Sequence, residues 1–285
     1  MVTRAPSRQR KTRPGPASYT GAKVAAVPEN NVAVMSRAEV ALARFSGLVR
    51  KGLRFRTRFE DAKRALEPAG FAWYPYDCFV NLFYLHRLLR SASLSLEQMA
   101  GGQPVLDVGA ADGALSFFLE SLGHTVHAVD YSGSNMNRME GLRSLARRFE
   151  SRITIQDADL DGRFEIPGSY GLALFLGTLY HLKNPFYALE TVARHAQYAF
   201  VSTRVARVSP DRSVRLDGMP VAYLLREGEC NADSTNYFIF SPAGLLLLVE
   251  RAGWSVCASV TAGTADSDPL SQQGDERMFL LLKRR

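Results

Sequence analysis

Val-Leu-Asp-Val-Gly-Ala-Ala-Asp-Gly, residues 105–113, is the stretch that decides the fold of this chain. Its first four residues are apolar except for Asp107 and predict a short buried strand. An apolar stripe at spacings of three and four residues begins at Leu115 and predicts a helix. Because glycine lacks a Cβ atom, the backbone at Gly109 and Gly113 can turn tightly and approach a ligand closely, while the helix start offers unpaired N–H groups. We therefore expect a binding site at this turn.

Strand and helix patterns alternate from this turn to the C-terminus, which is typical of a mostly parallel sheet covered on both faces. The sequence therefore predicts an α/β, Rossmann-like fold with seven strands. Residues 205–240 contain no convincing long element, and we interpret them as a substrate-facing insertion, since loops of that length are usually functional or disordered. The strands are expected at residues 105–108, 125–129, 153–155, 172–176, 199–202, 254–260 and 277–283. Later helices are expected from an N-cap at Ser134, over residues 184–196 and from Ser241-Pro242.

The part of the chain before the first strand has a helical pattern with one apolar face. We expect a disordered basic tail over residues 1–30, an N-terminal helical extension over 31–100 and the α/β domain over 101–285. An aromatic segment, residues 71–77, separates the helices because Pro75 forbids helix continuation. The expected buried face carries Phe79, Leu82, Phe83, His86 and Leu89.

The charge of the chain is concentrated near its start. The formal net charge is +7, and residues 1–65 hold 15 Lys and Arg against 4 Asp and Glu, a charge of +11, which leaves −4 for the rest. The three cysteines, Cys78, Cys230 and Cys257, are too few and too widely spaced for a disulfide framework or a Cys-x-x-Cys metal site. No apolar run reaches the roughly 18 residues of a membrane span. We expect a cytoplasmic protein without a metal or a membrane partner.

Acidic residues at strand ends indicate the kind of ligand. The Gly-x-Gly-x-x-Gly spacing of a dinucleotide site is missing, and Asp107 and Asp112 place negative charge on both sides of the turn, which suits an ammonium or sulfonium group. Asp130 ends the second strand, where an acid accepts hydrogen bonds from ribose hydroxyls, although a helix-capping role stays open. Asp157 and Asp159 follow the third strand and either meet an adenine amino group or are solvated loop acids.

Three blocks of sequence together resemble a known family. Residues 107–113, Val129-Asp130 and residues 175–185, Phe-Leu-Gly-Thr-Leu-Tyr-His-Leu-Lys-Asn-Pro, resemble class I S-adenosylmethionine (SAM)-dependent methyltransferases over roughly residues 70–285. Within that superfamily, the Leu-Tyr-His block, residues 236–242 and Glu276-Arg277 are similar to the tRNA wobble-uridine carboxymethyltransferase-like family. The resemblance implies the class I methyltransferase sheet with an N-terminal helical cap.

The resemblance also implies a cofactor and its site. Gly109 is expected at the methionine part, residues 130–132 at the ribose, Asp159 at the adenine, and Leu176 with Tyr180 at the reactive end. The carboxy-SAM members of the family place a lysine soon after the tryptophan that Trp73 matches, and residues 74–81 contain none, so ordinary SAM is the expected cofactor. The expected cofactor-binding residues are Asp107, Gly109, Ala111, Gly113, Asp130, Tyr131, Ser132, Asp157, Asp159, Leu176, Gly177 and Arg277.

Tyr180 and His181 are the candidate catalytic residues. They follow a strand at the carboxyl edge of the sheet, where ligands of open α/β folds bind, and histidine titrates near neutral pH. A packing role with a backbone hydrogen bond stays open for His181. Asn231, Asp233, Asn236 and Tyr237 form a polar patch that meets the acceptor or satisfies turns. The expected substrate residues are Trp73, Tyr76, Asn236 and Tyr237.

The function predicted from these observations is methyl transfer from SAM to an oxygen or nitrogen atom of a small molecule. One alternative is a tRNA-modifying enzyme that uses the basic leader to bind phosphates, which the sequence favours less. A second alternative is a SAM-binding module without catalysis. The sequence does not indicate an oligomeric state.

Overall fold

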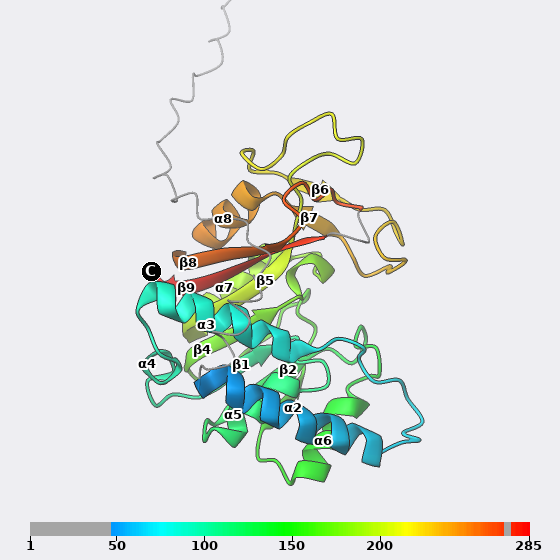
Figure 1. The fold of residues 1–285 in the computed structure, drawn as a ribbon, viewed down its shortest axis with the longest axis vertical. Coiled ribbons are helices and arrows are strands. Elements are labelled where there is room, and N and C mark those ends of the chain that lie inside the picture. Colours follow the sequence, from blue (N-terminus) through cyan, green and yellow to red (C-terminus); the bar gives the residue numbers. More distant parts are fainter. Residues whose placement is uncertain (1–46, 271–274) are drawn as a thin grey trace, which may run out of the picture. The chain divides into compact units, whose positions relative to one another are not determined.

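The structure is a computed structural model that describes residues 47–270 and 275–285, so the predicted basic tail lies outside the described residues. One sheet organises this part of the chain (Figure 1). Five parallel strands lie in the order β3, β2, β1, β4 and β5, β9 pairs antiparallel with β5, and β8 pairs antiparallel with β9. These strands are β1 (Val105–Val108), β2 (Val126–Asp130), β3 (Thr154–Asp157), β4 (Tyr170–Leu176), β5 (Ala196–Val205), β8 (Trp254–Gly263) and β9 (Glu276–Arg284).

The predicted seven-stranded core is confirmed, and the insertion adds two short strands to it. β6 (Ala222–Leu224) and β7 (Phe238–Phe240) form an antiparallel pair, and β7 pairs in parallel with the end of β5, where Phe240 lies opposite Val205. The sheet therefore has nine strands. The sequence did not indicate the two added strands, because a three-residue strand is too short for its alternation to stand out.

Helices cover both faces of the sheet and form two apolar cores, so strands such as β1 and β2 are buried on both sides. Successive strand residues alternate between the cores: Val105 contributes to the first core and Leu106 to the second. The first core contains α2 (Gly47–Ala65), α3 (Asn81–Ala92), α4 (Leu96–Ala100), α5 (Ala114–Ser121) and α6 (Glu140–Phe149). The second contains α7 (Pro185–His195) and α8 (Pro242–Arg251).

Two local predictions were wrong in detail. α6 begins at Glu140 and not after Ser134, because Arg138 and Met139 have positive φ and the side chain of Asn135 accepts hydrogen bonds from Asn137 and Met139. This makes residues 131–139 a series of turns. The buried face of α3 is also rotated from the one expected, since Phe83 and His86 are only half-buried. The fully buried residues are Leu82, Leu85, Leu88 and Leu89.

The start of α8 agrees with its prediction. Ser241 caps the helix by accepting from the backbone N–H of Gly244 at 2.9 Å, and Pro242 occupies the first turn.

No helix among the described residues is both long and apolar enough to cross a membrane.

Candidate functional site

The turn after β1 is as tight as predicted, but its glycines serve the packing of the protein. Gly109 and Gly113 have φ of +74° and +79°, in the left-handed region that favours glycine. A Cβ atom at Gly109 would overlap the side chain of Thr178, and one at Gly113 would overlap Leu142. The missing side chains therefore face neighbouring protein atoms and bring the turn close to the segment after β4.

Asp130 fixes this turn from the end of β2. Its Oδ2 atom accepts from the backbone N–H of Ala111 at 2.7 Å, and Oδ1 accepts from the N–H of Tyr131 at 2.7 Å. Because α6 begins ten residues later, the helix-capping role is wrong. Burial raises the pKa of Asp130, and the two backbone hydrogen bonds oppose that rise. The side chain of Asn135 also lowers this pKa, and a carboxylate has about four acceptor positions, so a ligand hydroxyl can still donate to Asp130.

A second carboxylate is buried at the neighbouring strand end. Asp107 accepts a hydrogen bond from the hydroxyl of Ser116 at 2.6 Å. Burial raises its pKa to about 6, the Ser116 bond lowers it, and the charge of Asp130 raises it further. Two desolvated acids of like charge are unfavourable unless a positive group or a hydrogen-bond donor joins them. The pair therefore fits a ligand that carries a positive charge and hydroxyl groups.

Asp112, in contrast, does not face a ligand, and the expectation that its charge serves one was wrong. Its Oδ2 atom lies 3.2 Å from Nζ of Lys63 and accepts from the N–H of Tyr74 at 2.8 Å. Its Oδ1 atom accepts from the side-chain amide of Asn137 at 2.7 Å. Both oxygens are thus occupied by the N-terminal helical part and by the turns before α6.

The sequence analysis did not single out Lys63. This side chain is buried, ion-paired with Asp112 and lies over the rings of Phe59 and Trp73, 5.4 and 5.2 Å from their centroids. The only signal in the sequence is a lysine beside the apolar face of α2, at Phe55, Phe59 and Ala62. Since long lysine stems often cover apolar surface with the charge in water, this signal is weak.

The segment between α2 and α3 lies across the ends of β1 and β2 (Figure 1). The hydroxyl of Tyr74 accepts from the N–H of Met136 at 3.0 Å, and burial raises the pKa of Tyr74 to about 12. Burial and then the charge of Asp107 raise the pKa of Cys78 to about 12. Of the predicted substrate residues here, Trp73 packs on Lys63, whereas Tyr76 is 74% exposed and close enough to Arg277 to influence its pKa.

The loops after β2 and β3 bring some of the remaining predicted cofactor residues together. The N–H of Ser132 donates to Oδ1 of Asp157 at 2.9 Å, and hydrogen bonds from Ser132 lower the pKa of that acid. The ring of Tyr131 lies against Gly133, where a Cβ atom would overlap it. Asp159 is exposed and accepts from the N–H of Asp161 at 2.9 Å, a local turn.

Residues from three distant segments meet at the end of β4. Gly177 has φ of +69°, and a Cβ atom there would lie 3.6 Å from Nη1 of Arg277. Arg277, in β9, donates from Nη2 to the hydroxyl of Tyr180 at 3.3 Å, and its Nε lies 3.6 Å from Oδ2 of Asp275. Leu176, the last residue of β4, is partly buried beside them. The predicted reactive-end residues therefore adjoin one another.

The 3-10 turn Leu179–His181 contacts the insertion. Nδ1 of His181 lies 2.9 Å from the hydroxyl of Thr235 and 3.9 Å from Oδ2 of Asp233. Burial lowers the pKa of His181, the charge of Asp233 raises it, and Arg277 lowers it. Thr235 was not recognised from sequence, because nothing in the insertion indicates which of its polar residues points toward β4.

The two predicted substrate residues of the insertion have different surroundings. Asn236 is buried and donates to the carbonyl of Cys230 at 2.9 Å, so it shapes the loop itself. Tyr237 donates from its backbone N–H to the carbonyl of Tyr180 at 2.8 Å, and Nζ of Lys183 lies 5.4 Å from its ring centroid. Tyr237 therefore adjoins the candidate catalytic residues, whereas Asn236 does not face outward.

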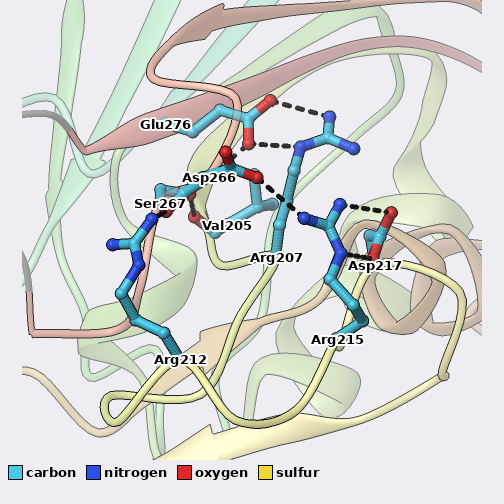
Figure 2. A network of polar contacts seen from close by, with 8 residues as sticks. All are labelled: Val205, Arg207, Arg212, Arg215, Asp217, Asp266, Ser267 and Glu276. Carbon is cyan, nitrogen blue, oxygen red and sulfur yellow. Dashed lines mark hydrogen bonds and ion pairs between the residues drawn. The ribbon is translucent and has the colours of Figure 1, made fainter.

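A polar network attaches the insertion to the loop before β9 (Figure 2). Arg207 forms a bidentate ion pair with the fully buried Glu276, at 2.6 and 2.7 Å. Arg215 pairs with Asp217 and Asp266 on the exposed side of the same network. Because Glu276 directly precedes Arg277, this network fixes the strand end that places Arg277 beside Tyr180.

Within the described residues, no cluster of three or more His, Cys, Asp or Glu side chains is arranged to hold a metal ion.

Known proteins with a similar sequence or structure indicate the family of this chain. A family model described as a methyltransferase domain matches residues 54–259. Among solved structures, the N-terminal domain of EvdMO1 with SAH bound is similar at 20% identity and a TM-score of 0.52, over 81% of this chain and 97% of that one. No curated protein sequence matches the chain significantly.

Two further structures have the same fold. A putative methyltransferase from Bacillus halodurans C-125 has 12% identity and a TM-score of 0.51, over 70% of this chain and 97% of that one. The [4+2]-cyclase SpnF has 12% identity and a TM-score of 0.50, over 75% of this chain and 87% of that one. At such identities these structures show a shared fold, and the cyclase illustrates that the fold supports more than one reaction.

Proposed function

The chain belongs to the methyltransferase-domain family, and on this premise we propose that it transfers the methyl group of SAM to an oxygen or nitrogen atom of a small molecule. SAM supplies a methyl group on a positively charged sulfur, together with ribose hydroxyls. The observation that carries the proposal is the buried pair Asp107 and Asp130 at neighbouring strand ends. Their desolvated carboxylates fit a ligand with a positive charge and hydroxyl groups.

We assign parts of the site to parts of the cofactor. Asp130 accepts from the ribose hydroxyls, with Tyr131 and Ser132 beside it, and the turn at Gly109, Ala111 and Gly113 adjoins the methionine part. Asp157 or Asp159 meets the adenine. Leu176, Gly177, Tyr180 and Arg277 lie at the reactive end. Arg277 already has Tyr180 and Asp275 as neighbours, and residues 74–81 contain no lysine, so ordinary SAM is our choice over carboxy-SAM.

Most of the catalysis in this proposal comes from positioning. Methyl transfer needs an in-line nucleophile close to the sulfonium, and a base is needed only when the acceptor carries a proton at neutral pH. His181 is our candidate for that base, and Tyr180 orients the reactive end through its contact with Arg277. Trp73, Tyr76 and Tyr237 are the proposed acceptor contacts.

Cys78, Cys230 and Cys257 are all free, which supports a reducing, cytoplasmic setting.

Calorimetry with S-adenosylhomocysteine (SAH) tests the cofactor assignment. We expect wild-type protein to bind SAH and Asp130→Asn to bind it at least ~10-fold more weakly, because a charge-assisted hydrogen bond is lost. Asp61→Asn is the matched control, since Asp61 is an exposed acid paired with Arg64 on α2. Well-folded wild-type protein that releases no heat with SAH contradicts the assignment, as does equal affinity in the Asp130 variant.

A transfer assay separates an enzyme from a non-catalytic SAM-binding module. The protein is incubated with SAM labelled in its methyl group and a polar small-molecule extract, and labelled products are identified by mass spectrometry. We expect a labelled product that depends on Asp130. SAH binding without any labelled product indicates the non-catalytic alternative.

A second candidate function is tRNA modification, and one observation favours it. The exposed face of α2 carries Arg50, Lys51, Arg54, Arg56, Arg58 and Arg64. Such a row of positive charge attracts phosphates, and binding through it weakens steeply with added salt. RNA affinity is measured at two salt concentrations for the full chain and for a variant without residues 1–30. Salt-independent or undetectable RNA binding eliminates this candidate, whereas a steep salt dependence supports it. Binding that persists after the deletion assigns the contact to α2, and binding lost on deletion assigns it to residues 1–30.

A further inference from the structure

Three polar side chains connect the end of β4 to the insertion. The hydroxyl of Thr235 lies 2.9 Å from Nδ1 of His181 and donates to Oδ1 of Asp233 at 2.6 Å. The backbone N–H of Thr235 donates to the same carboxylate oxygen at 2.8 Å, which fixes the threonine relative to Asp233. The hydroxyl of Thr235 therefore has a defined direction when it meets the imidazole.

The protons available in this chain of contacts determine the tautomer of His181. A threonine hydroxyl has one proton, and a carboxylate only accepts. Because Thr235 donates its proton to Asp233, its oxygen accepts from Nδ1–H of His181, and Nε2 then carries the free lone pair. The imidazole makes its hydrogen bonds to Thr235, from Nδ1 to the hydroxyl and also to the backbone of that residue, and 30% of the His181 side chain is exposed. Nε2 is thus the nitrogen that is free to accept a proton.

Charged groups on two other segments face this imidazole. Asp233 lies 3.9 Å from Nδ1 and favours the protonated ring, whereas Arg277 on β9 disfavours it. Burial is the largest influence and lowers the pKa of His181, which favours the neutral ring. The ring also lies 4.1 Å from that of Tyr180, centroid to centroid, at the proposed reactive end.

We propose that Thr235 and Asp233 are positioning residues that hold His181 as its Nδ1–H tautomer, so that Nε2 removes the proton of a hydroxyl acceptor. The proposal rests on the methyl transfer proposed above and specifies its acceptor as an alcohol. Nε2 of His181 takes the hydroxyl proton while the acceptor oxygen bonds to the methyl carbon. The sulfur keeps the electron pair of the S–C bond that breaks, so the products are SAH and a methyl ether. The imidazolium is stabilised by Asp233 and returns its proton to water.

Nitrogen NMR of the histidine rings tests the tautomer directly. The full chain, labelled with ¹⁵N-histidine and saturated with SAH, is measured at pH 7.5, and the His181 signals are assigned by their loss in His181→Gln. We expect a protonated, pyrrole-type Nδ1 and an unprotonated, pyridine-type Nε2. The reverse tautomer or a doubly protonated ring in wild-type protein overturns the proposal without any variant.

Variants of the two positioning residues complete the test. Thr235→Val removes the acceptor of Nδ1–H, so we expect a mixture of tautomers and a kcat about 100-fold lower in the labelled-methyl assay, with an unchanged KM for SAM. Thr235→Ser keeps the hydroxyl and is expected to restore both. In Asp233→Asn the pKa of His181 falls below that of wild type, because a charge favouring the imidazolium is lost. A Thr235→Val variant with the wild-type tautomer, or labelled products methylated only on nitrogen, overturns the proposal.

SAH calorimetry on the same variants distinguishes this proposal from the proposed function. If wild-type protein binds SAH but its His181 has the wrong tautomer, only the proposal that Thr235 and Asp233 position His181 fails. If wild-type protein does not bind SAH, the cofactor assignment fails first. We expect Thr235→Val and Asp233→Asn to bind SAH within about twofold of wild type, because neither residue contacts the turn after β1.

Discussion

The two ends of the site are built in different ways. At the ends of β1 and β2, the turn and its acids lie within a short piece of chain, and 19 residues separate Ala111 from its partner Asp130. At the end of β4, contacts join segments that are far apart, since Thr235 follows His181 by 54 positions and Arg277 follows Tyr180 by 97. The comparison shows that the hydrogen bonds between the turn after β1 and Asp130 form within one strand–helix–strand unit, whereas the acceptor side exists only after the insertion and β9 have packed.

The largest loss of stability is expected from variants that break the buried ion pair at either end of the site. Lys63→Met leaves Asp112 buried without a counter-ion, and Arg207→Met does the same to Glu276. Removing one partner of a buried pair costs about 3–5 kcal/mol, so we expect both variants to lose stability in denaturant unfolding. SAH affinity is expected to fall more in the Lys63 variant, because Asp112 belongs to the turn after β1, whereas Glu276 influences the cofactor site only through its neighbour Arg277. An equal loss of affinity in both variants contradicts the division into two ends.

The turn itself provides the next largest effect. Gly109→Ala combines a positive φ with overlap on Thr178, and we expect a loss of about 3 kcal/mol together with weaker SAH binding. Gly123→Ala is the matched control, since Gly123 has φ of +96° but nothing within 4 Å of an added Cβ. The control is expected to lose about 1 kcal/mol of stability, the cost of placing a Cβ atom on a backbone with positive φ, and no SAH affinity. Similar losses in both variants mean that contact with Thr178 contributes nothing.

Asp107 makes the stability of the ligand-free protein depend on pH. Its folded pKa, about 6, lies above the ordinary aspartate value of 3.8, so its contribution to stability is fully present below pH 3.8 and lost as pH rises through 6. Asp107→Asn removes this dependence and is expected to stabilise the ligand-free protein by about 2 kcal/mol at pH 7.5, while weakening SAH binding. Thermal unfolding of both proteins between pH 4 and 7.5 gives the difference, and parallel curves contradict the expectation.

The smallest expected effect separates the exposed and buried halves of the network in Figure 2. Arg215 is 60% exposed and pairs with Asp217 and Asp266 in water, where ion pairs contribute little. Arg215→Gln is therefore expected to leave the denaturation midpoint unchanged, in contrast to Arg207→Met. A clear loss of stability in the Arg215 variant means that the insertion is held by its exposed contacts as well.

Prediction from sequence was successful where neighbouring residues decide the structure. The strand, turn and helix around Gly109 and the cap at Ser241 follow from hydrophobic period and turn chemistry, which act over a few residues. The start of α6 was missed because the side chain of Asn135 competes with the helix for backbone hydrogen bonds. The face of α3 was misjudged because Tyr84 stacks on Phe279, in β9, at 4.0 Å.

The sequence by itself determined the α/β core, the family and the two acids at adjacent strand ends, because these depend on period, spacing and residue type. Only the tertiary structure decided that Asp112 is neutralised by Lys63, that Arg277 lies on Tyr180, and that Thr235 and Asp233 meet His181. Those contacts depend on which side chains are brought together across tens of residues, and on which lone pairs and protons remain once the nearer partners are satisfied.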